Sequence, residues 1–158
     1  MTDKINIDEL EFDFAEHYDE ELASAGREFE VFAPNGNKEG TFICAYWSSD
    51  NPEVALAIDR TNRKYFHALQ AEKKARKKDA EYVDHDLQLK MLRDVFLDGV
   101  LLGWKDITAK GKPVPFSKEA ARKYFESKKA TFVLAELTKC AVDEMNFQGE
   151  AKEAVSGN

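Results

Sequence analysis

Three histidines are the side chains best suited to acid–base or metal chemistry, but the sequence keeps them apart. His17 lies in an acidic N-terminal stretch, His67 lies in a helical pattern, and His85 stands between Asp84 and Asp86. Consecutive residues of a helix point about 100° apart, so the three residues at 84–86 cannot converge on one metal ion. We interpret the histidines as surface residues and predict no metal site.

Serines and glycines also lack the arrangement that nucleophilic catalysis or nucleotide binding needs. Ser48 and Ser49 have no GxSxG elbow around them, and a role at a helix start explains both. The stretch GKPVPFS at 111–117 differs from a phosphate-binding GxxxxGK[ST] loop, because its lysine follows a lone glycine and precedes a proline. The sequence therefore predicts no catalytic residue and no cofactor, and we expect a protein that is not an enzyme.

The two cysteines predict neither a disulfide nor a zinc site. Cys44 and Cys140 are far apart in sequence, have no CxxC or CxxH pairing, and stand among apolar neighbours. The longest apolar run, near Leu101, is much shorter than the roughly 20 residues of a membrane-spanning helix. The acidic N-terminus does not resemble a secretion signal, so we expect a cytoplasmic protein without membrane contact.

Charge is distributed unevenly along the chain. Residues 1–30 contain eleven acidic residues against Lys4 and Arg27, a net charge of −9, whereas the whole chain carries −7. This polarity could steer a basic partner to the N-terminus or bring the acidic segment against the basic run KKARKK at 73–78. We favour a solvated acidic segment, and for the basic run a solvated helix end over a nucleic-acid contact.

The patterning predicts an α+β, predominantly helical fold, with an N-terminal β-hairpin or small sheet followed by about four helices. We expect residues 1–28 to form an acidic, flexible segment in which Leu10–Phe14 alternate as in an edge strand or a segment ordered by a partner. A single globular domain should span 29–147, with a flexible tail at 148–158. Its expected elements are a hairpin at 29–47 and helices at 52–75, 81–104, 117–127 and 130–146.

The expected helix at 81–104 has the most regular apolar face of the sequence. Its polar side is expected to face water with Asp84, Lys90, Arg93 and Asp94. Gly99 and Gly103 each lower helix propensity by roughly 1 kcal/mol relative to alanine, so the helix should loosen or end near Trp104.

Aromatic residues are the remaining candidates for a binding surface. Tryptophan usually lies in the core, and this is one interpretation of Trp47 and Trp104. The alternative, from which we take the candidate partner-binding residues, is an apolar patch for another protein formed by Phe42, Tyr46, Trp47, Trp104 and Phe116. Replacing Trp104 with alanine should cost about 3 to 5 kcal/mol if this ring is in the core and much less if it is a contact surface.

Residues 101–125 carry a pattern that resembles a known family. The stretches LLGWKDI at 101–107 and GKPVPFS at 111–117 are followed by Glu119, Ala120 and Ala121. This order of a GW, a polar turn, a G-x-P-x-PF segment and a capped helix resembles the small tail assembly chaperones of long-tailed bacteriophages. The upstream order is similar from about residue 40, with the strand TFICAYW, a helix opened by NPE and a basic stretch. The acidic front shows no resemblance.

The resemblance implies a non-enzymatic role in the host cytoplasm. Such chaperones bind the apolar tape-measure protein, keep it soluble, help to recruit tail tube subunits and are absent from the mature virion. Self-association remains an option. The alternatives are a structural minor tail or head-to-tail joining protein that stays in the virion and, less favoured, a nucleic-acid-binding regulator that uses Lys73–Lys78.

Overall fold

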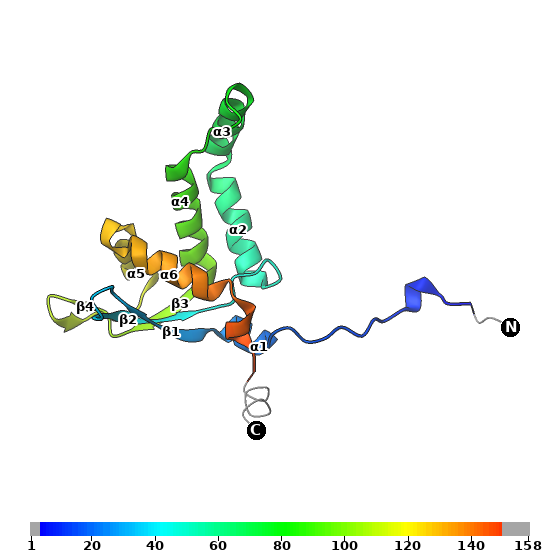
Figure 1. Ribbon diagram of the computed structural model, residues 1–158, viewed down its shortest axis with the longest axis horizontal. Helices are drawn as coiled ribbons and strands as arrows, with labels where there is room; N and C mark the ends of the chain where they lie inside the picture. The colour runs from blue at the N-terminus through cyan, green and yellow to red at the C-terminus, as the bar shows by residue number, and fades with distance from the viewer. Residues whose placement is uncertain (1–3, 150–158) are drawn as a thin grey trace.

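The computed structural model describes residues 4–149. It has the predicted α+β architecture, with a small antiparallel sheet, helices over the sheet and a group of helices that rises from it (Figure 1). The helices are α1 Glu20–Ala25, α2 Pro52–Lys64, α3 Phe66–Lys78, α4 His85–Val95, α5 Lys118–Glu126 and α6 Thr131–Ala141, with a π-helical turn at Phe96–Val100 and short 3-10 turns at Ile7–Glu9, Lys128–Ala130 and Glu144–Phe147. The strands are β1 Arg27–Phe32, β2 Lys38–Cys44, β3 Leu101–Lys105, β4 Thr108–Ala109 and β5 Lys112–Pro113.

The central sheet has the strand order β1-β2-β3 and is antiparallel throughout. The predicted hairpin is present as β1 and β2, and Gly36 takes the positive φ of 87° that its turn requires. It ends at Cys44 rather than at residue 47. In the register of β2 with β3, Phe42 lies opposite Trp104, so these two side chains share one face of the sheet.

The hydrophobic core lies between the sheet and the helices α5 and α6, which cover it (Figure 1). Ser117 caps α5 as the sequence predicts, since its hydroxyl accepts the N–H of Ala120 at 3.0 Å. The largest fully buried side chains are Phe42, Phe96, Phe147, Leu101, Leu137, Val54, Val100, Val133 and Cys44.

The helices α2, α3 and α4 form a projection that we call the arm, residues 52–95 (Figure 1). Val54, Ala57 and Thr61 recur at three and four residues along α2 and are all buried. This stripe packs against α4 and the π-helical turn. By contrast, α3 lies at the far end of the arm and has no buried residue.

The helix expected at 52–75 is two helices. The backbone of Tyr65 takes φ −101° and ψ 18°, which separates α2 from α3. The Tyr65 hydroxyl donates a hydrogen bond to Asp94 on α4 at 2.7 Å. This tertiary contact, which no local pattern reveals, holds the break in place.

The helix expected at 81–104 is wrong beyond residue 100. Residues 85–95 are α-helical and 96–100 form the π-helical turn, but 101–105 are the edge strand β3. The backbone of this stretch pairs with β2, and Gly103 lies opposite Ile43. The physical reason is that pairing with β2 satisfies the backbone N–H and C=O groups of residues 101–105, whereas Gly99 and Gly103 disfavour a continued helix.

The remaining boundaries shift by smaller amounts. The structure has α5 at 118–126 and α6 at 131–141, where helices at 117–127 and 130–146 were expected. Apart from the turn at Ile7–Glu9, residues 4–18 of the acidic front are extended. The helix α1, which follows them, was not predicted from the sequence. Of the tail expected at 148–158, residues from 150 onward lie outside the described residues.

Candidate functional site

Phe42 and Trp104 lie in the core, which confirms the core interpretation of Trp104 and makes the candidate aromatic patch wrong for both residues. Phe42 is completely buried, and Trp104 is 7% exposed. Their ring centroids lie 6.4 Å apart, and the indole N–H of Trp104 donates to the Val114 carbonyl at 2.9 Å. The reason is their common face in the β2–β3 register, which α5 covers with Tyr124 and Phe125. These rings are core and cannot bind a partner in this fold.

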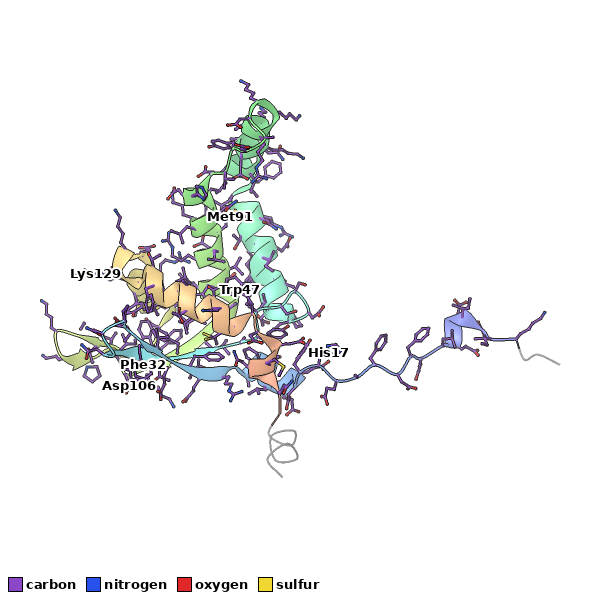
Figure 2. All side chains as sticks on the ribbon, in the orientation of Figure 1. His17, Phe32, Trp47, Met91, Asp106 and Lys129 are labelled. Atoms are coloured by element: carbon purple, nitrogen blue, oxygen red, sulfur yellow. The ribbon has the colours of Figure 1, made fainter. Side chains whose placement is uncertain are left out.

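The other three predicted aromatics are half-buried and pack on rings elsewhere in the body. Phe116 meets Trp104 edge-on, with ring centroids 5.4 Å apart. Trp47 stacks on Phe96 at 6.2 Å, at the base of the arm (Figure 2). Tyr46 lies between Tyr18 and Phe147, at 4.8 and 5.1 Å. The five rings therefore do not form one exposed patch.

Exposed apolar side chains gather instead on the N-terminal segment, by which we mean residues 4–17. Every residue of this segment is exposed, and it runs outward from the body in extended form (Figures 1 and 2). Five of its side chains are large and apolar: Ile5, Ile7, Leu10, Phe12 and Phe14. Phe14 is 88% exposed, and together the five side chains form an apolar row outside the folded body, the kind of surface that marks an interaction site. Sequence reasoning noted the alternation here but did not name it as the site.

The arm carries the second group of exposed apolar side chains. They are distributed over α2, α3, α4 and the loop before α4: Leu56, Phe66, Tyr82, Val83 and Leu89. Phe66 opens α3 and is 53% exposed. Because helices with no buried residue gain little from packing, α3 has no evident role in stabilising the body.

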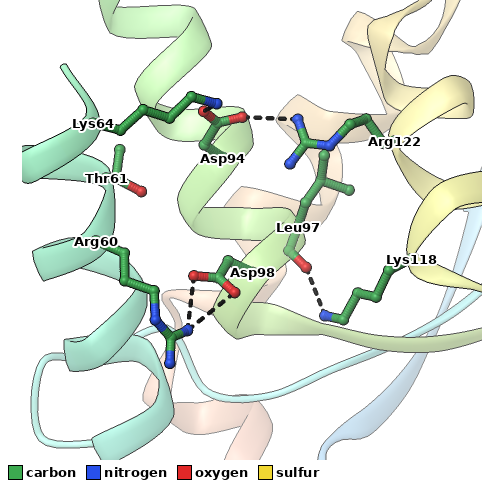
Figure 3. A pocket seen from close by; sticks show the side chains of 8 residues that line it. All are labelled: Arg60, Thr61, Lys64, Asp94, Leu97, Asp98, Lys118 and Arg122. Atoms are coloured by element: carbon green, nitrogen blue, oxygen red, sulfur yellow. Dashed lines mark hydrogen bonds and ion pairs between the residues drawn. The ribbon is translucent and has the colours of Figure 1, made fainter.

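A charged network joins the arm to α5 at the base of the arm (Figure 3). Asp94, expected to face water, has a side chain only 8% exposed. Its carboxylate accepts hydrogen bonds from Lys64 at 2.9 Å and from Arg122 on α5 at 3.1 Å, in addition to the Tyr65 hydroxyl. The local sequence pattern of α4 could not reveal the pairing of Asp94 with Arg122, because Arg122 lies on α5.

Burial alone would raise the pKa of Asp94, but the hydrogen bonds from Lys64, Tyr65 and Arg122 outweigh it and lower the pKa. The hydrogen bond between Lys64 and Asp94 raises the pKa of Lys64, although burial of the amine lowers it. Burial raises the pKa of Tyr65, and its bond to Asp94 adds to that effect. The network therefore keeps Asp94 ionised and Lys64 charged at neutral pH.

Beside this network lies a cavity of about 300 Å³. Arg60 pairs with Asp98 at 3.0 Å across it, and Lys118 donates to the carbonyls of Leu97 and Leu101 at 2.7 and 3.3 Å (Figure 3). Burial lowers the pKa of Lys118. Each of these charged groups already has a partner within the protein. The arrangement is suited to fixing the angle of the arm rather than to chemistry on a ligand.

Replacing Asp94 with asparagine should lower the free energy of unfolding by about 1 to 2 kcal/mol at pH 7, because two cations lose their anionic partner. The value is below that of a fully buried pair because Lys64 and Arg122 are 59% and 45% exposed. Urea unfolding at several pH values measures it. The folded pKa of Asp94 is lowered, so its stabilisation is present above about pH 4 and is lost as the pH falls. A difference between variant and wild type that grows toward low pH would contradict this assignment.

The residues considered first for chemistry remain apart in the fold. The three histidines are all exposed, as predicted, and lie on the N-terminal segment, on α3 and at the start of α4. Ser48 accepts the Asp50 N–H at 3.2 Å, whereas Asn51 occupies the cap position of α2. Cys44 is buried and Cys140 half-buried, and both are free thiols. Among residues 4–149, no group of histidine, cysteine, aspartate or glutamate side chains could hold a metal ion.

The basic run predicted at 73–78 forms the last part of α3 and the end of the arm. Its lysines are fully exposed, and Arg76 pairs with Glu72 at 3.0 Å. None of the helices in the described part of the chain combines the length and the apolar character of a membrane span.

Comparison with protein families decides the origin of the chain. The YdaY prophage protein family matches residues 49–158, which is more than two thirds of the sequence. The chain belongs to the YdaY prophage protein family. It is therefore a phage-derived protein. The match spans the arm, residues 101–117 with Trp104, and the helices α5 and α6, and it begins after the β1–β2 hairpin. Comparisons with curated proteins and with solved structures returned no match.

Proposed function

We propose that this YdaY family protein is a tail assembly chaperone, a non-enzymatic protein that binds the tape-measure protein in the host cytoplasm and keeps it soluble. In this proposal it also helps to recruit tail tube subunits and leaves before the virion is complete. The observation that carries the proposal is the set of large apolar side chains left exposed on the N-terminal segment and on the arm.

These surfaces suit a client that is long, apolar and not yet assembled. A holding protein needs apolar side chains that are accessible without unfolding, with charge around them to keep the complex soluble. The N-terminal segment supplies both, since Phe12 and Phe14 alternate with Glu11 and Asp13. An extended segment can also follow a client that has no fixed shape, at the cost of being ordered on binding.

The body provides a fixed support for these surfaces. The Asp94 network and the packed stripe of α2 hold the arm against the sheet and α5. Membership of a prophage family and the resemblance of residues 101–125 to tail assembly chaperones favour the same role.

Co-expression with the tape-measure protein of the same phage tests the proposal. The expected result is that the tape-measure protein moves from the insoluble to the soluble fraction and co-purifies with this chain. A truncated chain without residues 1–16 tests the contribution of the N-terminal segment. It retains the body and the arm and should rescue less of the tape-measure protein than the full chain does. Purified virions should lack the protein by mass spectrometry. The proposal is contradicted if the tape-measure protein stays insoluble. It is also contradicted if this protein remains in the purified particle, as a structural component would.

A further inference from the structure

One face of α3 combines an exposed aromatic ring with unpaired positive charge. Phe66, Lys73 and Lys77 are seven and eleven residues apart, so they share a face of the helix, and Lys74 and Lys78 lie next to it. All four lysines are exposed, and none of them has an ion pair among the described residues. This face therefore offers four uncompensated cations in the last part of the helix and an apolar ring at its start.

The N-terminal segment offers the complementary pattern. Asp8, Glu9, Glu11 and Asp13 are exposed and have no ion pair within residues 4–149. They stand between exposed apolar side chains that end in the neighbouring rings of Phe12 and Phe14, 6.4 Å apart. The four acidic residues thus match the four lysines in number and in opposite charge, and the apolar row matches Phe66 in kind.

We propose that residues 5–14 of one chain dock on α3 of a second copy of this chain, with the acidic side chains on Lys73, Lys74, Lys77 and Lys78. The apolar row then contacts Phe66, which removes apolar surface of both copies from water. Opposite charge guides the two surfaces together and sets the orientation of the segment along the helix.

The reach of the chain favours a second copy over the same copy. Tyr18 is anchored at the base of the arm, where its ring meets Tyr46, and Asn51 at the start of α2 donates to the Tyr46 carbonyl. An extended chain spans about 3.3 Å per residue and a helix rises about 1.5 Å per residue. Glu11 and Asp13 can therefore reach only about 23 and 17 Å from Tyr18, whereas Lys73 lies about 30 Å along the arm from the start of α2. Asp8 and Glu9 just reach that distance, so all four acidic side chains can meet the lysines together only on a second copy.

This docking goes beyond the proposed chaperone function, although it involves some of the same surfaces. It predicts that the free chain associates with itself through the apolar side chains that a client would otherwise contact. The test uses the purified chain alone, so its failure leaves the co-expression result standing, and the converse also holds.

Sedimentation equilibrium of two charge-reversed variants tests the docking. One variant carries D8K, E9K, E11K and D13K, and the other carries K73E, K74E, K77E and K78E. Because all eight side chains are exposed, both variants should melt like the wild type. The wild type should associate in a concentration-dependent and salt-sensitive way, and each variant alone should show a dissociation constant raised by about tenfold or more.

Mixing the two variants separates docking between copies from docking within one copy. The basic segment of the first variant matches the acidic helix of the second, and the reverse pair also matches, so the mixture should regain association. A wild type that stays monomeric at every concentration contradicts the proposal. It is equally overturned if both variants associate like the wild type, or if the mixture stays dissociated, as docking within one copy requires.

Discussion

Replacing Trp104 with alanine is expected to lower the free energy of unfolding by about 3 to 5 kcal/mol. The ring is 7% exposed and lies against Phe42, Phe116 and Tyr124 with centroids 5.4 to 6.4 Å apart. Removing it opens a cavity among aromatic side chains from both the sheet and α5, and also frees the Val114 carbonyl that its N–H holds at 2.9 Å. Urea unfolding followed by circular dichroism measures the loss.

The matched control is Phe132 on α6, which is an aromatic residue with 41% exposure. Its replacement by alanine should change stability by about 0.5 kcal/mol or less. If the Trp104 variant unfolded at the same urea concentration as this control, the ring would have to be a contact surface, and the assignment of residues 101–105 to the core sheet would be wrong.

Replacing Gly99 with alanine is expected to cost about 2 to 3 kcal/mol and to move the arm. Gly99 lies in the π-helical turn, where an added Cβ would stand 2.7 Å from Ala57 Cβ and 3.0 Å from the Glu53 carbonyl oxygen. Two of the nearest atoms belong to the backbone of α2, so the strain cannot be relieved by turning one side chain. The helix α2 must shift away from the turn instead.

Gly103 provides the control for the Gly99 variant. An added Cβ there would meet only Ile43, whose Cδ1 lies at 3.3 Å at the end of a flexible side chain. Gly103→Ala should therefore change stability by less than about 1 kcal/mol. Equal melting temperatures for the two alanine variants would show that α2 does not pack on the π-helical turn as closely as the structure has it.

Local signals in the sequence were sufficient to predict the elements that begin and end on them. Pro52 in the first turn of α2, Ser117 before α5 and the turn glycine Gly36 each mark a boundary that the structure confirms. The overall α+β character followed from these signals and from the apolar periodicity of the helices.

Strand β3 could not be predicted in the same way because its pairing is not local. Leu101 and Trp104 are buried in the strand, and both would also fit the apolar stripe of a helix continued from α4. What decides the outcome is the open edge of β2, more than fifty residues earlier in the chain. Gly99 and Gly103 did indicate that the helix would weaken, but not what would replace it.

The candidate site shows the same limit. Aromatic type alone cannot separate a ring in the core from a ring on a surface, so Phe42 and Trp104 were chosen for a property that the core residues Phe96, Phe125 and Phe147 share. Phe12 and Phe14 differ from them in having no neighbouring element to pack on, and this becomes visible only when the body is complete. Asp94 is the converse case. It was expected to face water, but its side chain is buried and accepts a hydrogen bond from Arg122 on α5.

The most direct test of the proposed holding function is the soluble yield of the tape-measure protein with a chain that carries F12S, F14S and F66S. These three rings are exposed, so the variant should melt like the wild type yet rescue only a small part of the client that the wild type rescues. The control F132S removes an exposed ring from α6 and should rescue the client fully. Full rescue by the triple variant would contradict the claim that the N-terminal segment and the arm hold the client.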